Sequence, residues 1–376
     1  MRNAIITSVL FSTFIALAGC NGGTGTDGEE DGTTAGGPGG PGGSTGTTGS
    51  SCAAVTGNLP LPGSKGTTPS IAWGGDAFGV AWSSQDKDEG DIQFALLDTS
   101  GELLGQSVVY EGAGISSVPS IAARGGGFVV VWRDSDGKIR GRNLDGGGAP
   151  QGEAFEVGAT ANIDTRPSVA SAVPGTVVAW SDVGQSFLGV LGTSGMTNQQ
   201  TIPNAMFPAV TGAGVTAGVA WSEGATVGFS KVDPKSADMQ AAVTRNATTP
   251  ANLSLASDGT RFFVAWEDLR SGEEEVYLSD GGDAEVRVHG ESGSANWPSL
   301  AWTGSHIAAV YYQFRDGPPQ IFLSLIGPDM VRATQDLEVT ADGAARFPSV
   351  AWSGDRLGVV WAIKDGGVET AMVECH

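Results

Sequence analysis

Short runs of alternating apolar and polar residues recur along this chain, separated by turns rich in Gly and Asp. One block occurs seven times: Pro-Ser-aliphatic-Ala, a Gly-rich turn, then two small apolar residues and an aromatic residue. The blocks begin at Pro69, Pro119, Pro167, Pro208, Leu253, Pro298 and Pro348. The aromatic stands 13 positions later in each, as Trp82, Trp132, Trp180, Trp221, Trp266, Tyr311 and Trp361. A regular period of 41 to 50 residues is the signature of a repeat architecture.

Each repeat contains four candidate strands, which in the first repeat are 70–73, 78–82, 92–97 and 107–110. Four antiparallel strands in 40 to 50 residues are typical of a propeller blade. The pattern therefore predicts an all-β fold, a seven-bladed β-propeller with four antiparallel strands per blade. The aromatic series is predicted to pack one blade against the next, with ligand stacking as the alternative. The third strands of repeats three and four are expected to be short.

The N-terminus carries an apolar run from Ala4 to Leu17 behind Arg2, too short for a bilayer span and suited to a signal peptide. It ends in Leu-Ala-Gly-Cys20, which resembles the lipobox of bacterial lipoproteins. The resemblance implies a signal peptide over 1–19 and acylation of the Cys20 thiol by chains such as palmitate. An ordinary secretory signal with a chance cysteine is the alternative. Asn at position 21 favours the outer membrane, on its periplasmic or its surface side.

Residues 21–51 contain 15 Gly and Pro residues among 31 positions and no large apolar residue. Such a segment cannot bury a core, so 20–51 is predicted to be a flexible tether that spans roughly 30 Å. The propeller domain is then expected to occupy 52–376.

The seventh repeat ends without a fourth strand, at about Val373. Residues 53–61 lie where that strand is needed, and we expect them to complete the last blade and close the ring. Cys52 and Cys375 flank this seam, so a disulfide between them is predicted in an oxidising compartment. Two unpaired thiols are the alternative.

Composition narrows the functional classes. Acidic residues outnumber basic ones 41 to 20, for a formal charge of −21, which argues against nucleic acid as a partner. A hydrophobic content of 40% with ten tryptophans argues against a wholly disordered chain.

Residues 69–376, with repeats of the form PSxAWxGxxxxVxW, resemble propeller lipoproteins of Gram-negative bacteria and are distantly similar to TolB-type propeller repeats. The resemblance implies a monomeric propeller in the cell envelope, attached to the membrane through the N-terminal lipid. It carries no catalytic residue to this chain, because the shared pattern is structural.

Two kinds of loop should meet on one face of the propeller, those from strand two to three and those from strand four to the next blade. The first kind places carboxylates two residues after the aromatic, at Asp134, Asp182, Glu223 and Asp268. The second kind places larger side chains before the block, at Arg166, Phe207, Trp297 and Phe347. Such a face could bind a cation, a basic peptide or a sugar. Alternatively, the carboxylates only stabilise their turns.

Metal and enzymatic signals are weak. The run DKDEGD offers Asp86, Asp88 and Asp91 as ligands for calcium, but it lacks EF-hand spacing, and no other cofactor is predicted. The three histidines are scattered, and no nucleophile-elbow motif occurs. The preferred hypothesis is an envelope lipoprotein whose propeller is a binding or scaffolding module for an unknown protein or glycan. A glycan hydrolase with paired carboxylates, or a subunit of an envelope assembly, are the alternatives.

Overall fold

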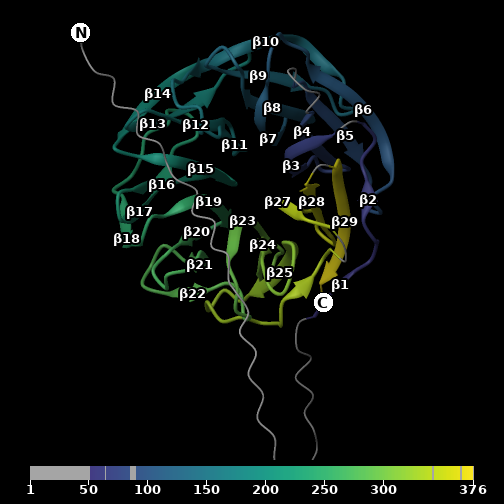
Figure 1. The fold of residues 1–376 in the computed structure, drawn as a ribbon. Helices are drawn as coiled ribbons and strands as arrows, with labels where there is room; N and C mark the ends of the chain where they lie inside the picture. Colours follow the sequence, from purple (N-terminus) through teal and green to yellow (C-terminus); the bar gives the residue numbers. More distant parts are fainter. Residues whose placement is uncertain (1–50, 64, 85–89, 341–342, 365, 376) are drawn as a thin grey trace, which may run out of the picture. The chain divides into compact units, whose positions relative to one another are not determined.

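Seven antiparallel sheets follow one another around a central axis (Figure 1). They are formed by the residues that the computed structural model describes, which are 51–63, 65–84, 90–340, 343–364 and 366–375. Each sheet has four strands in antiparallel succession, and the last has one short additional strand. The predicted all-β, seven-bladed propeller is confirmed.

Blades 1 to 3 each follow the order of the chain from the axis to the rim. Blade 1 contains β3 (Gly66–Trp73), β4 (Phe78–Ser84), β5 (Ile92–Leu97) and β6 (Leu103–Tyr110). Blade 2 contains β7 (Ser117–Arg124), β8 (Gly127–Arg133), β9 (Lys138–Leu144) and β10 (Pro150–Ala159). Blade 3 contains β11 (Ser168–Ser171), β12 (Thr176–Asp182), β13 (Gln185–Leu191) and β14 (Met196–Pro203).

Blades 4 to 7 continue the same order. Blade 4 contains β15 (Met206–Ala213), β16 (Thr216–Glu223), β17 (Thr226–Val232) and β18 (Val243–Asn246). Blade 5 contains β19 (Ala251–Ser257), β20 (Phe262–Asp268), β21 (Glu275–Ser279) and β22 (Glu285–Arg287). Blade 6 contains β23 (Ala295–Trp302), β24 (Ile307–Gln313), β25 (Gln320–Ile326) and β26 (Leu337–Glu338). Blade 7 contains β27 (Ala345–Trp352), β28 (Leu357–Ile363), β29 (Val368–Cys375) and, from the start of the chain, β1 (Cys52–Ala54) and β2 (Leu59–Pro60).

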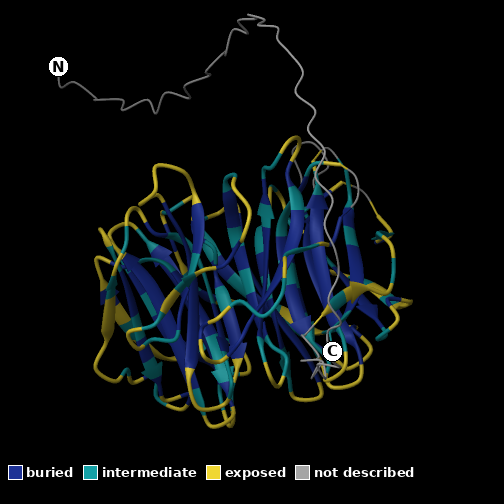
Figure 2. Ribbon diagram, turned by 90° about the horizontal axis from the view of Figure 1, so that it is seen from below, coloured by how far each residue is buried: buried dark blue, intermediate teal, exposed yellow. Residues whose placement is uncertain are grey.

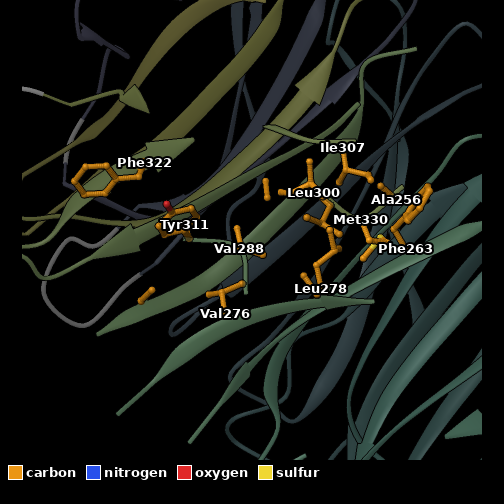
Figure 3. Close-up of a cluster of buried hydrophobic side chains, with 14 residues drawn as sticks. Ala256, Phe263, Val276, Leu278, Val288, Leu300, Ile307, Tyr311, Phe322 and Met330 are labelled. Carbon is orange, nitrogen blue, oxygen red and sulfur yellow. The ribbon is translucent and has the colours of Figure 1, made fainter. Parts of the chain in front are cut away.

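The core lies between blades. Figure 2 shows buried strands flanked by exposed loops at the two ends of the propeller. Seven hydrophobic clusters of buried residues each combine side chains of two neighbouring blades. Figure 3 shows the cluster between blades 5 and 6, which includes Phe263 and Tyr311. All seven repeat aromatics are buried, with at most 5% of any side chain exposed. Their predicted structural role is confirmed, because one sheet cannot bury both of its faces alone.

The two ends of the propeller domain meet in blade 7. Strand β1 lies beside β29 (Figure 1) and pairs with it so that Cys52 lies opposite Cys375. The two cysteines are joined by a disulfide. Strand β2 pairs with the other end of β29, through Leu59 and Thr370. The predicted closure and the predicted disulfide are confirmed, with the expected single strand divided into two short ones.

A ring of serine hydroxyls joins the innermost strands. In six repeats the serine at the second position of the block accepts a hydrogen bond from a backbone N–H of the next blade, at 3.0 to 3.3 Å. The serines are Ser70, Ser120, Ser168, Ser254, Ser299 and Ser349. Blade 4 has Ala209 at this position and lacks the bond. Because an innermost strand has no partner on its axial side, these hydroxyls satisfy donors that a sheet edge would leave open.

The expectation of short third strands in repeats three and four is wrong. Strands β13 and β17 have seven residues each, more than β5 or β21. Glycines interrupt the hydrophobic pattern there without interrupting the strand. At Gly189 a Cβ would lie 2.4 Å from the Met196 sulfur, so the missing side chain makes room for the neighbouring strand. The short element of blade 3 is its first strand, β11.

Candidate ligand site at the mouth of the central channel

A repeated β-bulge shapes the start of six of the seven innermost strands. In each, two residues on the inner strand face one residue on the second strand, and that one residue is the repeat aromatic. In blade 1, for example, Thr68 and Pro69 lie opposite Trp82. The bulge therefore turns the residue before the block toward the axis at a point fixed by the core.

The bulge places non-glycine residues in the left-handed region of backbone conformation. The residues before the block have φ between 47° and 57° at Thr68, Val118, Phe207, Asn252, Trp297 and Phe347. This region is unfavourable for L-residues, and most unfavourable for β-branched and bulky ones. The strand pairing on both sides of the bulge must hold these residues in this conformation. Strained backbone conformations of this kind are concentrated at functional sites.

These positions surround a cavity of about 200 Å³ on the axis of the ring. All seven innermost strands contribute to its lining through the bulge residues and the Pro-Ser pairs that follow. Arg166, Phe207 and Trp297, which the sequence placed near the channel mouth, all line it. Phe347 packs edge-on against Trp297, with ring centroids 4.5 Å apart. These four predicted side chains are thus brought together, although their role in ligand binding stays a prediction.

Arg166 reaches across the mouth from blade 3 to blades 5 and 6. Its Cζ lies 3.6 Å from the ring centroid of Trp297, and its Nη1 donates a hydrogen bond to Oδ1 of Asn252. A guanidinium over an aromatic face is a favourable cation–π arrangement. Burial lowers the pKa of Arg166 to about 10, while the nearby Glu267 opposes that shift. The side chain is therefore still charged at neutral pH.

Glu267 holds the two residues that contact Arg166. Its Oε1 accepts hydrogen bonds from the backbone N–H of Trp297 at 2.5 Å and from Nδ2 of Asn252 at 2.7 Å. The residue is 8% exposed, and burial raises the pKa of its carboxyl. Tyr312 lies in the same environment, and burial together with the charge of Glu267 raises its pKa to about 12.

Two of the predicted carboxylates form ion pairs within their own blades. Asp134 accepts hydrogen bonds from Nε of Arg140 at 2.5 Å and from the Tyr110 hydroxyl at 3.1 Å. Asp268 is 1% exposed and accepts hydrogen bonds from Nε1 of Trp266 at 3.0 Å and from Nη2 of Arg270 at 2.6 Å. These contacts are those of carboxylates that fix a loop.

The other two predicted carboxylates differ from them. Asp182 accepts a hydrogen bond from the backbone N–H of Ala161 at 2.8 Å, whereas Glu223 is exposed. The structure thus gives three of the four carboxylates a local structural contact. A role for any of them in ligand binding stays a prediction.

Two predicted sites fall wholly or partly outside the described residues. Cys20 is outside them, as are Asp86 and Asp88 of the candidate calcium run. Asp91 is described, and its backbone N–H donates to the Ser84 hydroxyl at 3.1 Å. In the described part of the chain, no group of three or more His, Cys, Asp or Glu residues is arranged to hold a metal ion. The calcium prediction therefore stays untested. No helix among the described residues is long and apolar enough to cross a membrane.

Two members of the site are only weakly indicated by the sequence. Asn252 occupies the same repeat position as Arg166 and Trp297, but its block begins with Leu253 instead of proline. Glu267 is one of many acidic residues, and its contacts depend on two blades that come together in the fold. The signal that could have identified Asn252 is its position in the repeat.

Comparison with known proteins supports the fold. No family model matches the chain, and no curated protein matches it. Among solved structures, the Dos1 propeller is similar with a TM-score of 0.53 and 9% sequence identity, over 84% of this chain and 95% of that one. At this identity the likeness shows the fold alone. The resemblance to propeller lipoproteins and to TolB-type repeats remains an expectation from the sequence, and what the comparison establishes is a seven-bladed β-propeller.

Proposed function

We propose that this protein is a binding module whose ligand enters the mouth of the central channel. The observation that carries the proposal is the ring of bulge residues, where six non-glycine side chains occupy left-handed backbone conformations. Backbone strain that recurs at equivalent positions indicates that these side chains have a function at the mouth of the channel. The residues displayed are Thr, Val, Arg, Phe, Asn, Trp and Phe in the seven blades, although the Pro-Ser block beside them is nearly constant.

The size and chemistry of the cavity support binding of a small group. A volume of about 200 Å³ suits one side chain or one end group of a larger ligand, with the surrounding loops left to contact the remainder. The aromatic rings of Phe207 and Trp297 supply apolar surface, and Arg166 and Asn252 supply polar contacts. This combination of apolar walls and few polar groups is usual in ligand sites.

The contacts favour binding over the hydrolase alternative. Hydrolysis of a glycosidic bond needs two carboxylates at the ligand. In the described part of the chain, no carboxylate lines the cavity. Asp134 and Asp268, two of the four sequence candidates, are each paired with an arginine.

A capture experiment tests the binding role. The protein and a Phe207→Ala/Trp297→Ala variant are immobilised and exposed to an envelope extract of the producing organism, and each species enriched on the protein is then titrated against both. Loss of two central aromatic anchors should weaken binding by at least about 30-fold, which corresponds to about 2 kcal/mol.

The matched control is Val173→Ala/Val215→Ala. These valines are 65% and 74% exposed in the loops between first and second strands, at the opposite end of the blades from the bulges. The control should bind as the unmodified protein does. Equal binding by all three proteins would contradict a ligand site at the channel mouth.

We further propose that Cys20 anchors the protein to a bacterial membrane. Asn at position 21 favours the outer membrane. The support is the lipobox resemblance of residues 17–20. More than one acyl chain makes such anchoring stable. The test is metabolic labelling with an alkyne fatty acid and membrane fractionation of the protein and its Cys20→Ser variant. A variant that is still processed and still found in the membrane would contradict the proposal.

A further inference from the structure

Arg166 is the single charged residue among the described residues that line the channel-mouth cavity. It forms no ion pair with any residue in the described ranges, although the chain as a whole is strongly acidic. Of its five N–H donors, one is accepted by Asn252. A partly buried charge without a direct ion pair is unfavourable, even with the carboxylates of Glu267 and Asp164 nearby, so its retention at this position indicates a function.

The serine ring adds hydrogen-bond donors beneath Arg166. All six serines that accept a backbone N–H from the next blade also line the cavity. Each hydroxyl has one proton, and accepting a bond leaves that proton available to donate. No described residue accepts a hydrogen bond from any of the six hydroxyls. The cavity thus offers one guanidinium and several O–H donors.

Two carboxylates, those of Glu267 and Asp164, lie near enough to Arg166 to favour its charged form, but in the described part of the chain neither forms an ion pair with it or lines the cavity. The Oε1 atom of Glu267 is shared by the backbone N–H of Trp297 and by Nδ2 of Asn252. The ring of Trp297, whose centroid lies 3.6 Å from Cζ of Arg166, holds the guanidinium in position. A planar fork with free N–H groups is the geometry that binds a carboxylate or a phosphate through two parallel hydrogen bonds.

We propose that the channel mouth binds an oxyanionic group, held by Arg166 and by the serine hydroxyls, whose apolar body packs on Phe207 and Trp297. The proposal rests on the binding role proposed above and names the chemistry of the ligand. A carboxylate and a phosphate ester share this chemistry, and the experiment separates them.

The probes are two matched pairs and one ester: benzoate with benzyl alcohol, glucuronate with glucose, and glucose 6-phosphate. Binding to the full chain is followed by the NMR signal of the Trp297 indole N–H, assigned with Trp297→Phe. In each matched pair we expect the anion to bind at least about tenfold more tightly than its neutral partner, which corresponds to about 1.4 kcal/mol. Comparison of glucuronate with glucose 6-phosphate then shows which oxyanion the site prefers.

The variants are Arg166→Gln, which removes the charge, and Arg166→Lys, which keeps the charge and removes the fork. We expect the first to lose the preference for anions and the second to retain part of it. Lys235→Gln is the charge-matched control, because Lys235 is exposed in the β17–β18 loop at the other end of the blades. The indole signals of the other tryptophans report whether each variant is folded, and Arg166→Lys provides the test should Arg166→Gln not fold.

Three results would overturn the inference: equal binding of anions and neutral partners, unchanged anion binding by Arg166→Gln, or no shift of the Trp297 signal by any probe. Equal binding of neutral and charged probes that depends on Trp297 would leave the binding role in place and remove only the oxyanion. Failure of the binding role itself is seen separately, in the capture experiment with Phe207→Ala/Trp297→Ala.

Discussion

Removal of the seam disulfide tests how the ring is held closed. The perturbation is Cys52→Ser with Cys375→Ser in the full chain, in a Cys20→Ser background so that only this pair differs. The disulfide joins residues 323 positions apart, and β1 and β2 are short strands that otherwise depend on pairing with β29. Loss of the disulfide therefore raises the conformational entropy of the unfolded chain and weakens the seam, which is the pairing of β1 and β2 with β29.

The magnitude follows from the length of the closed loop. For a loop of 323 residues the chain-entropy relation gives an upper figure of about 6 kcal/mol. Unfolding entropy near 2.1 cal/mol/K per residue amounts to about 0.7 kcal/mol/K for a domain of this length, so the expected fall in Tm is up to about 9 °C. The reduced protein should match the serine variant.

Differential scanning calorimetry of the oxidised protein, the reduced protein and the variant measures the shift. Amide hydrogen exchange of β1 and β29 shows whether the seam opens before the rest of the ring. The same Tm for all three, within about 1 °C, would refute the reasoning that the disulfide limits the unfolded chain. A lower Tm with unchanged exchange in β1 would refute the weakened seam.

Three further predictions concern single side chains. Ala209→Ser should supply the missing acceptor for the backbone N–H of Leu255 and raise the free energy of unfolding by about 1 kcal/mol. Ser254→Ala should lower the free energy of unfolding by a similar amount, because it removes an acceptor that is present. Urea denaturation measures both changes, and a destabilised Ala209→Ser variant would contradict the role given to the serine ring. Trp266→Ala should lower the free energy of unfolding by about 3 to 5 kcal/mol, because the side chain is fully buried between blades 4 and 5. A decrease of less than about 1 kcal/mol in the same assay would contradict that packing role. Burial raises the pKa of the Glu267 carboxyl in the folded state, so the stability that this group contributes is fully present below its ordinary pKa of 4.5 and is lost as the pH rises through the folded value. Glu267→Gln should remove this part of the fall in the free energy of unfolding, and identical pH profiles of the two proteins would contradict it.

The repeat made most of the fold predictable. Seven blocks with an aromatic at a fixed position determine the number of blades, and the missing last strand with Cys52 and Cys375 beside it determines where the ring closes. The boundaries of β5 match the expected range of 92–97. The third strands of blades 3 and 4 are longer than expected because Gly189 and Gly228 interrupt the apolar pattern without breaking the strand.

The site was predictable in part. Topology alone brings Arg166, Phe207, Trp297 and Phe347 to one mouth, because each directly precedes the repeat block, at or just before the start of an innermost strand. The contacts between them were not predictable, since Arg166 reaches past blade 4 to residues 86 and more positions away. Glu267 holds Asn252 and Trp297 because it is buried between blades, and its burial could not be predicted from the sequence. One partner of Asp134, the Tyr110 hydroxyl, likewise comes from the neighbouring blade.

The bulge opposite six of the seven repeat aromatics separates two tasks within one short stretch of chain. The aromatic fixes the backbone from the core side, and the residue across from it faces the axis with its conformation already set. A substitution at the axial position therefore changes the surface of the mouth and leaves the packing between blades intact. Six such positions on one scaffold can be altered one at a time, so the surface of the mouth can change while the fold stays the same.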